Sequence, residues 1–198
     1  LSLTWAATPS VNLGKSFPTA PIKDQGKIGF CWANAILSFL ETRSLQTHHP
    51  VTLSANYFGM MYLYTEIQKV LPEMEVLIQR QQELSKYTQF EAMNSVFERI
   101  SFSRIQKKSP DTGNYYRDAI QLLDQVGAVP ESVVAQPKFI TQAAKTTPDL
   151  EKTYEKWAQS QLIQPKIIHQ FIQEPRLLLN ALAEIFELKP LDRNEEFE

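Results

Sequence analysis

Residues 21–41 read PIKDQGKIGFCWANAILSFLE and contain the only cysteine of the chain. Gly26 and Gly29 mark the first half of this stretch as a loop. From Cys31 onward, apolar residues recur at the period of a helix. These residues are Trp32, Ala35, Ile36, Phe39 and Leu40. The stretch therefore predicts a loop that turns into a helix at Cys31, with Trp32, Phe39 and Leu40 in the core.

The position of Cys31 is suited to a nucleophile. A cysteine attacks as a thiolate, and the first turn of a helix lowers the thiol pKa because unpaired N–H groups favour negative charge there. Gln25, shortly upstream, carries an amide able to donate to the oxyanion that forms when a thiolate adds to a carbonyl. Most lone cysteines are small buried hydrophobes. The Gln-Gly-x-x-Gly-x-Cys-Trp pattern at a helix start favours the nucleophile instead.

This segment resembles the active-site segment of papain-family cysteine peptidases, where Pro-Val-Lys-Asn-Gln-Gly leads into Gly-Ser-Cys-Trp-Ala-Phe. The matching positions are Pro21, Lys23, Gln25, Gly26, Gly29, Cys31, Trp32 and Ala33. The resemblance implies that Cys31 is the nucleophile and that Gln25 and the Cys31 backbone N–H form the oxyanion hole. It also implies that Gly29, Phe30 and Trp32 border the substrate.

Two later segments extend the resemblance in the same order. TLSANYF, residues 52–58, resembles the family's Leu-Ser-Glu-Gln segment and predicts Ser54 as the cap of a second helix. DTGNYYRDAIQLLDQVGAVPES, residues 111–132, resembles the Gly-Gly-x-x-x-x-Ala-Leu segment, whose backbone pairs with substrate as an added strand. This assigns Gly113 and Asn114 to the substrate-binding edge.

Departures from the papain pattern point to one branch of the family. Ile28 stands where secreted papains have a disulfide cysteine, Phe30 replaces the usual Ser, and Asn114 replaces the second Gly. A long insert, about residues 57–108, replaces a short connection. A disulfide-free active-site loop with a helical insert resembles the bleomycin hydrolase (aminopeptidase C) branch. Because that branch assembles into rings, a homo-oligomer is a further expectation.

The rest of the chain reads as helices. Residues 54–71 form one predicted helix, with the YFGMMYLY cluster at 57–64 in the core, and 73–107 form one long helix or a helical pair. The polar face of 73–107 is expected to be solvated, with an oligomer contact as the alternative. Residues 116–129 predict a short helix stopped by Gly127. Its inward residues are Ile120, Leu122, Leu123 and Val126. Residues 150–163 and 175–188 are also predicted helices.

The predicted fold is therefore mainly α. The resemblance implies the left-hand helical domain of a papain-like α+β fold with a helical insertion, the β-barrel half being largely absent from this chain. The expected division is an extended segment at 1–20, a catalytic domain at 21–56 and 109–140, the insertion at 57–108, and a helical extension at 141–198 leading toward the missing barrel.

A papain-type site also needs a histidine to pair with the thiolate and an asparagine to orient that histidine. His48 and His49 fall in a turn and are expected to be solvated. His169 lies at the family's sequence spacing from Cys31, but the helical insert already accounts for that spacing. The residues around His169, KIIHQFIQEP, favour a histidine on a helix face. Asn180 falls in an apolar helix. The expectation is that His and Asn come from a second chain or a missing C-terminal part.

The expected function is hydrolysis of peptide or protein substrates through an acyl-enzyme at Cys31, with negligible activity for this chain alone. A catalytically inactive papain-like scaffold is the alternative, and acyl transfer to an amine is a third. A net charge of −2 over 198 residues gives no reason to expect nucleic-acid binding, and no apolar run is long enough for a membrane span. No cofactor or metal is expected. The start at Leu1 indicates a processed product or a piece of a longer chain, and the compartment is left open.

Overall fold

The computed structural model describes residues 19–21, 31–80, 86–101, 115–134 and 150–189. The described helices are α1 (Cys31–Gln46), α2 (Ala55–Gln79), α3 (Lys86–Ile100), α5 (Tyr115–Val126), α6 (Glu131–Val134), α8 (Leu150–Gln161), α9 (Pro165–Gln173) and α10 (Pro175–Ile185). Within these ranges there is no strand of two or more residues; Leu53 and Pro130 form an isolated antiparallel bridge, and Leu188 is a further bridge residue. The prediction of a mainly helical chain is confirmed for the described residues.

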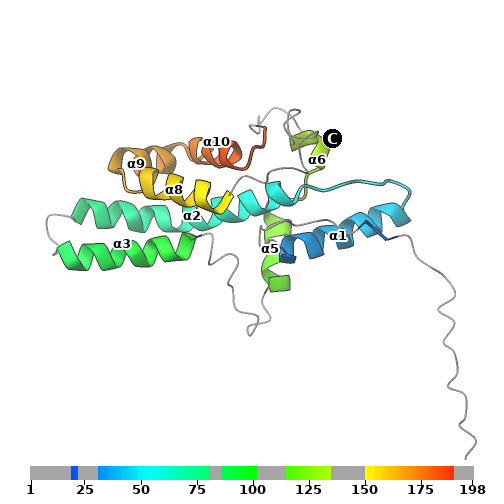
Figure 1. Ribbon diagram of the computed structural model, residues 1–198, viewed down its shortest axis with the longest axis horizontal. Helices are drawn as coiled ribbons and strands as arrows, with labels where there is room; N and C mark the ends of the chain where they lie inside the picture. The colour runs from blue at the N-terminus through cyan, green and yellow to red at the C-terminus, as the bar shows by residue number, and fades with distance from the viewer. Residues whose placement is uncertain (1–18, 22–30, 81–85, 102–114, 135–149, 190–198) are drawn as a thin grey trace, which may run out of the picture.

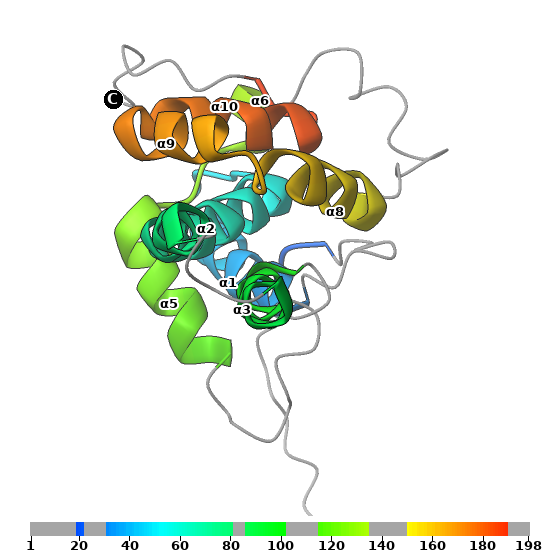
Figure 2. The ribbon, with the colours of Figure 1, turned by 90° about the vertical axis from the view of Figure 1, so that its left-hand side faces the viewer.

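Helix α2 is the central element. It is about 37 Å long and packs against α1, α3, α5, α9 and α10. Figures 1 and 2 show α8, α9 and α10 along one side of α2, with α3 and α5 on other sides. The predicted core cluster at 57–64 is confirmed, because Tyr57, Phe58, Met60, Tyr62 and Leu63 are all buried.

The start of α2 agrees with the sequence, whereas its end does not. Ser54 is the N-cap, and its hydroxyl oxygen accepts the N–H of Tyr57 at 3.2 Å. The predicted separation of a helix at 54–71 from one that begins at residue 73 is wrong, because α2 continues through Pro72 to Gln79. A proline inside a helix costs about 3 kcal/mol. Burial of Leu71 and Met74 on either side recovers about 1.5–3 kcal/mol for each side chain, which is enough to keep the helix continuous.

The predicted core faces of two shorter helices are partly wrong. On α1, Ala33, Ile36 and Leu37 are buried and Leu40 is half-buried, but the side chain of Phe39 is 63% exposed. The buried face is therefore rotated away from Phe39. On α5, Leu122 is buried and Leu123 and Val126 pack against the core, whereas Ile120 is exposed and Ala119 takes the inward position.

A Schellman motif ends α1. The N–H of His49 donates to the C=O of Ser44 at 3.1 Å, and the N–H of His48 donates to the C=O of Leu45 at 3.2 Å. His48 has a φ of 61°, the left-handed conformation that this motif requires and that favours glycine. Both histidines are exposed, as expected for this turn.

Replacing His48 by glycine should raise the free energy of unfolding by about 0.5–1 kcal/mol, because glycine adopts a positive φ without strain. The measurement is urea unfolding of the wild-type chain and of the variant. His49→Gly is the matched control, since His49 is equally exposed but is not among the residues with positive φ. A stabilisation of the same size in both variants would contradict the explanation.

Helices α8, α9 and α10 form the second half of the core. The Trp157 ring lies between Tyr154 and Phe171, with ring centroids 6.0 and 6.2 Å away. Tyr154 is 1% exposed, and its hydroxyl donates to the C=O of Ile100 at 2.6 Å. This hydrogen bond ties α8 to the last residue of α3.

Replacing Tyr154 by phenylalanine should lower the free energy of unfolding by about 1 kcal/mol near neutral pH, because the buried C=O of Ile100 loses this donor. Burial, and secondarily the negative charge of Glu155, raises the pKa of Tyr154 above its ordinary value. Since the folded pKa exceeds the unfolded one, this tyrosine's contribution is complete below about pH 10 and is lost as the pH rises further. Urea titrations should therefore show the difference between the two proteins shrinking above about pH 10. A constant difference would contradict this account.

Candidate active site

Helix α1 begins at Cys31, the residue at which the sequence predicts the loop to become helical. The backbone of Cys31 therefore lies in the first turn of α1, where N–H groups have no intrahelical acceptor. The side chain of Cys31 and the residues Gln25, Gly29 and Phe30 lie outside the described residues, so their predicted roles stay predictions.

Trp32 anchors the start of α1 on α2. Its ring contacts Phe58, with centroids 5.6 Å apart, and meets Tyr62 edge-on at 5.3 Å. Trp32 packs against the core, as the sequence predicts. Aromatic pairs of this kind add about 0.5–1.5 kcal/mol beyond the area that they bury. The contacts of Trp32 therefore fix which part of α2 lies beside the start of α1, where the backbone of Cys31 is located.

A buried carboxylate, which the sequence reasoning missed, joins α1 to the start of α2. Glu41 is 3% exposed, and its Oε1 accepts the N–H of Leu53 at 2.5 Å. In the same connection, the Ser44 hydroxyl oxygen accepts the N–H of Val51 at 3.2 Å. The available signal was a Glu at helical spacing from Leu37 on the buried face of α1. A carboxylate in that position has to bind something polar.

The segment after α5 is hydrogen-bonded to the residues just before α2. Ser54 donates its N–H to the C=O of Val129 at 3.0 Å, and Glu131 donates its N–H to the C=O of Thr52 at 2.8 Å. Helix α5 packs on α1 and lies beside the end of α1 that begins at Cys31 (Figure 1). The predicted substrate-edge residues Gly113 and Asn114, directly before α5, lie outside the described residues.

The hydroxyl of Tyr57 fastens the C-terminal end of α5 to α2. It donates to the C=O of Val126 at 3.2 Å, and burial raises the pKa of Tyr57 above its ordinary value. Gly127 follows with a φ of 70°, and its N–H donates to the C=O of Leu123 at 2.8 Å. This is the αL stop that the sequence predicts. Helices α1, α2 and α5 are thereby held as one unit around the start of α1.

All three histidines of the chain are described, and none lies at the Cys31 end of α1. His48 and His49 follow the other end of this helix, about 24 Å along its axis. His169 is on α9, where its Nδ1 lies 2.9 Å from Oε1 of Glu75 on α2. Glu75 is about four turns, or about 20 Å, along α2 from Tyr62, which contacts Trp32. His169 is therefore a histidine on a helix face, as predicted, and is remote from Cys31.

No family model, curated protein or solved structure matches the chain. Among the described residues, no three His, Cys, Asp or Glu side chains are grouped so that they could hold a metal ion. None of the described helices combines the length and the apolar character that crossing a membrane requires.

Proposed function

We propose that this chain supplies the nucleophile and the oxyanion hole of a papain-like cysteine peptidase. The observation that carries the proposal is the start of α1 at Cys31, within a sequence that places Gln25 and two glycines just upstream. A helix N-terminus favours the thiolate, and an amide together with a backbone N–H suits a developing oxyanion.

The arrangement of the neighbouring helices supports the same proposal. Ser54 caps α2 at the point where the resembling family opens its second helix. Helix α5 begins directly after Gly113 and Asn114 and packs on α1. The three segments that carry the resemblance therefore belong to elements that contact one another, although they are far apart in the sequence.

In the proposed reaction, the Cys31 thiolate forms a bond to the carbonyl carbon of the scissile peptide. The side-chain amide of Gln25 and the backbone N–H of Cys31 donate to the oxyanion. As the C–N bond breaks, an imidazolium of the partner polypeptide gives its proton to the leaving amine. The imidazole then takes a proton from water, whose oxygen attacks the thioester and releases the acid and the Cys31 thiolate, which restores the thiolate–imidazolium pair.

The imidazole must come from outside this chain, because the chain's own three histidines lie about 20 Å or more from the Cys31 end of α1. The partner is therefore a second polypeptide, or a further part of the same protein, that carries the base and its orienting asparagine. The distance of the three histidines from Cys31 is also what supports the second candidate function: without a partner that supplies the base, the chain is a catalytically inactive scaffold.

The chain alone should react slowly with iodoacetamide at about pH 6, because Cys31 has no imidazole with which to form an ion pair. Intact-mass analysis of the alkylated chain measures the rate, and His169→Ala should leave it unchanged. Rapid alkylation of the isolated chain would refute the need for an external base.

The decisive measurement uses native material. Intact mass shows whether a second polypeptide copurifies, and a fluorogenic dipeptide reports hydrolysis. The proposal expects cleavage by the assembled protein and a loss of at least about 10⁴-fold in Cys31→Ser, as for removal of other catalytic nucleophiles. An assembled protein with no Cys31-dependent hydrolysis would leave the scaffold as the function.

A further inference from the structure

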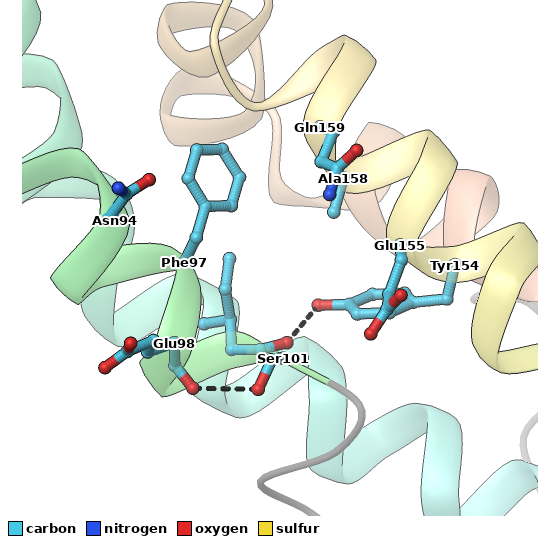
Figure 3. Close-up of a pocket in the computed structure, with 9 residues that line it drawn as sticks. Asn94, Phe97, Glu98, Ser101, Tyr154, Glu155, Ala158 and Gln159 are labelled. Carbon is cyan, nitrogen blue, oxygen red and sulfur yellow. Dashed lines mark hydrogen bonds between the residues drawn. The ribbon is translucent and has the colours of Figure 1, made fainter. Parts of the chain in front are cut away.

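A pocket of about 340 Å³ lies between the C-terminal half of α3 and helix α8. Its lining consists of Asn94, Phe97, Glu98, Ile100, Ser101, Tyr154, Glu155, Ala158 and Gln159. Figure 3 shows the two walls, with Phe97 on the α3 side and Tyr154 and Glu155 on the α8 side. This volume lies within the range of sites for small ligands or single side chains.

Four polar side chains of the pocket have no partner among the described residues. The side chains of Asn94, Glu98, Glu155 and Gln159 make no hydrogen bond or ion pair to other described residues. Two of these groups are carboxylates, and the described lining residues include no lysine, arginine or histidine. The neighbouring Arg99 is paired with Glu73 of α2. The pocket therefore favours a ligand that carries positive charge and donates hydrogen bonds.

The aromatic side chains add a second preference. Phe97 supplies ring surface to the pocket, whereas Tyr154, which is 1% exposed, forms part of the wall and is held there because its hydroxyl donates to the C=O of Ile100. An aromatic face attracts an ammonium or guanidinium group, and its hydrocarbon surface accepts the alkyl stem of such a group.

The pocket continues along α3 as an exposed aromatic stripe, formed by Tyr87 and Phe90, whose side chains are 70% and 65% exposed. These residues share one helix face with Asn94 and Phe97, because positions three and four apart lie one above the other on a helix. A ligand seated in the pocket can extend over the stripe only if it has further groups beyond its cationic end.

We propose that the α3–α8 pocket binds a lysine or arginine side chain of a peptide segment from a partner protein, and that apolar residues of the same segment cover Tyr87 and Phe90. The carboxylates of Glu98 and Glu155 select the cation, and the stripe favours a peptide over a free small amine. This binding site is independent of Cys31 and of the proposed peptidase reaction.

The test uses a short, fluorescein-labelled amphipathic peptide with one central arginine flanked by leucines. Its matched control has citrulline, a neutral isostere, in place of the arginine, and agmatine serves as the free small cation. Binding to the full chain is measured by fluorescence anisotropy for the peptides and by ¹H–¹⁵N chemical-shift changes for all three probes. We expect the arginine peptide to bind at least about fivefold more tightly than the citrulline peptide and than agmatine.

Variants locate the site. Glu155→Gln and Phe90→Ala should each weaken binding of the arginine peptide by about three- to tenfold. The matched controls Glu184→Gln on α10 and Phe39→Ala on α1, both exposed, should leave it within about twofold. Circular dichroism confirms that each variant is folded. Equal binding of the arginine and citrulline peptides would overturn the proposal, as would binding unaffected by Glu155→Gln and Phe90→Ala. Agmatine binding as tight as that of the peptide would overturn the choice of a peptide.

Discussion

Replacing Phe58 by alanine will lower the free energy of unfolding by about 3–5 kcal/mol, because a fully buried ring is removed and the cavity collapses only in part. The ring lies where α1 and α2 meet and contacts Trp32, so the loss includes the aromatic contact that anchors the start of α1. Since domains of this size are stable by about 5–15 kcal/mol, this single change removes a large share of the total. Urea unfolding followed by tryptophan fluorescence gives the value.

Phe39→Ala is the matched control for this prediction. Phe39 has the same side chain and lies on α1, but it is 63% exposed, so its replacement should change stability by less than about 0.5 kcal/mol. Similar losses in the two variants would contradict the position of the core between α1 and α2. A loss below about 1 kcal/mol for Phe58→Ala would contradict it equally.

Replacing Glu41 by alanine will lower the free energy of unfolding by about 1.5–3 kcal/mol. The N–H of Leu53 loses a charged acceptor inside the protein, where water does not replace it. The same N–H lies beside the bridge that joins Leu53 to Pro130. The effect should therefore extend to the segment after α5, and faster hydrogen exchange at Ser54 and Glu131 would report it.

Glu41→Gln separates the hydrogen bond from the charge. Glutamine keeps an oxygen that can accept the N–H of Leu53, so this variant should lose less than half as much stability as Glu41→Ala. Glu91→Ala on the exposed face of α3 should change stability by less than about 0.5 kcal/mol. Equal losses for Glu41→Gln and Glu41→Ala would show that the charge, not the acceptor, is what α1 requires.

The sequence predicted the helices and their caps better than their inward faces. Ser54 and Gly127 act through their own side chain or backbone conformation, which is local information. The exposure of Phe39 and Ile120 depends on which neighbouring helix covers each face. The periodicity of apolar residues in the sequence does not give that information. The helix continues through Pro72 for the same reason, since burial of Leu71 and Met74 by distant segments outweighs the free-energy cost of a proline inside a helix.

The candidate site shows the same limit. The motif around Cys31 located a helix start, and Trp32 was correctly assigned to the core. The partners of these residues come from elsewhere, with Phe58 and Tyr62 on α2. Glu41 was missed because a glutamate at the end of an apolar run is expected at the surface, and its acceptance of the N–H of Leu53 is evident only from the structure. The α3–α8 pocket joins residues too far apart in the chain for a sequence pattern to connect.

The dependence of α2 on α9 and α10 has a consequence for synthesis. These helices cover α2 in the finished protein, yet they are translated roughly a hundred residues later, which at 5–20 residues per second is about 5–20 s. During that interval the apolar side of α2 destined for α9 and α10 is uncovered on the ribosome. Chaperones that bind nascent chains should therefore engage this chain soon after α2 emerges and leave it once α10 has been made.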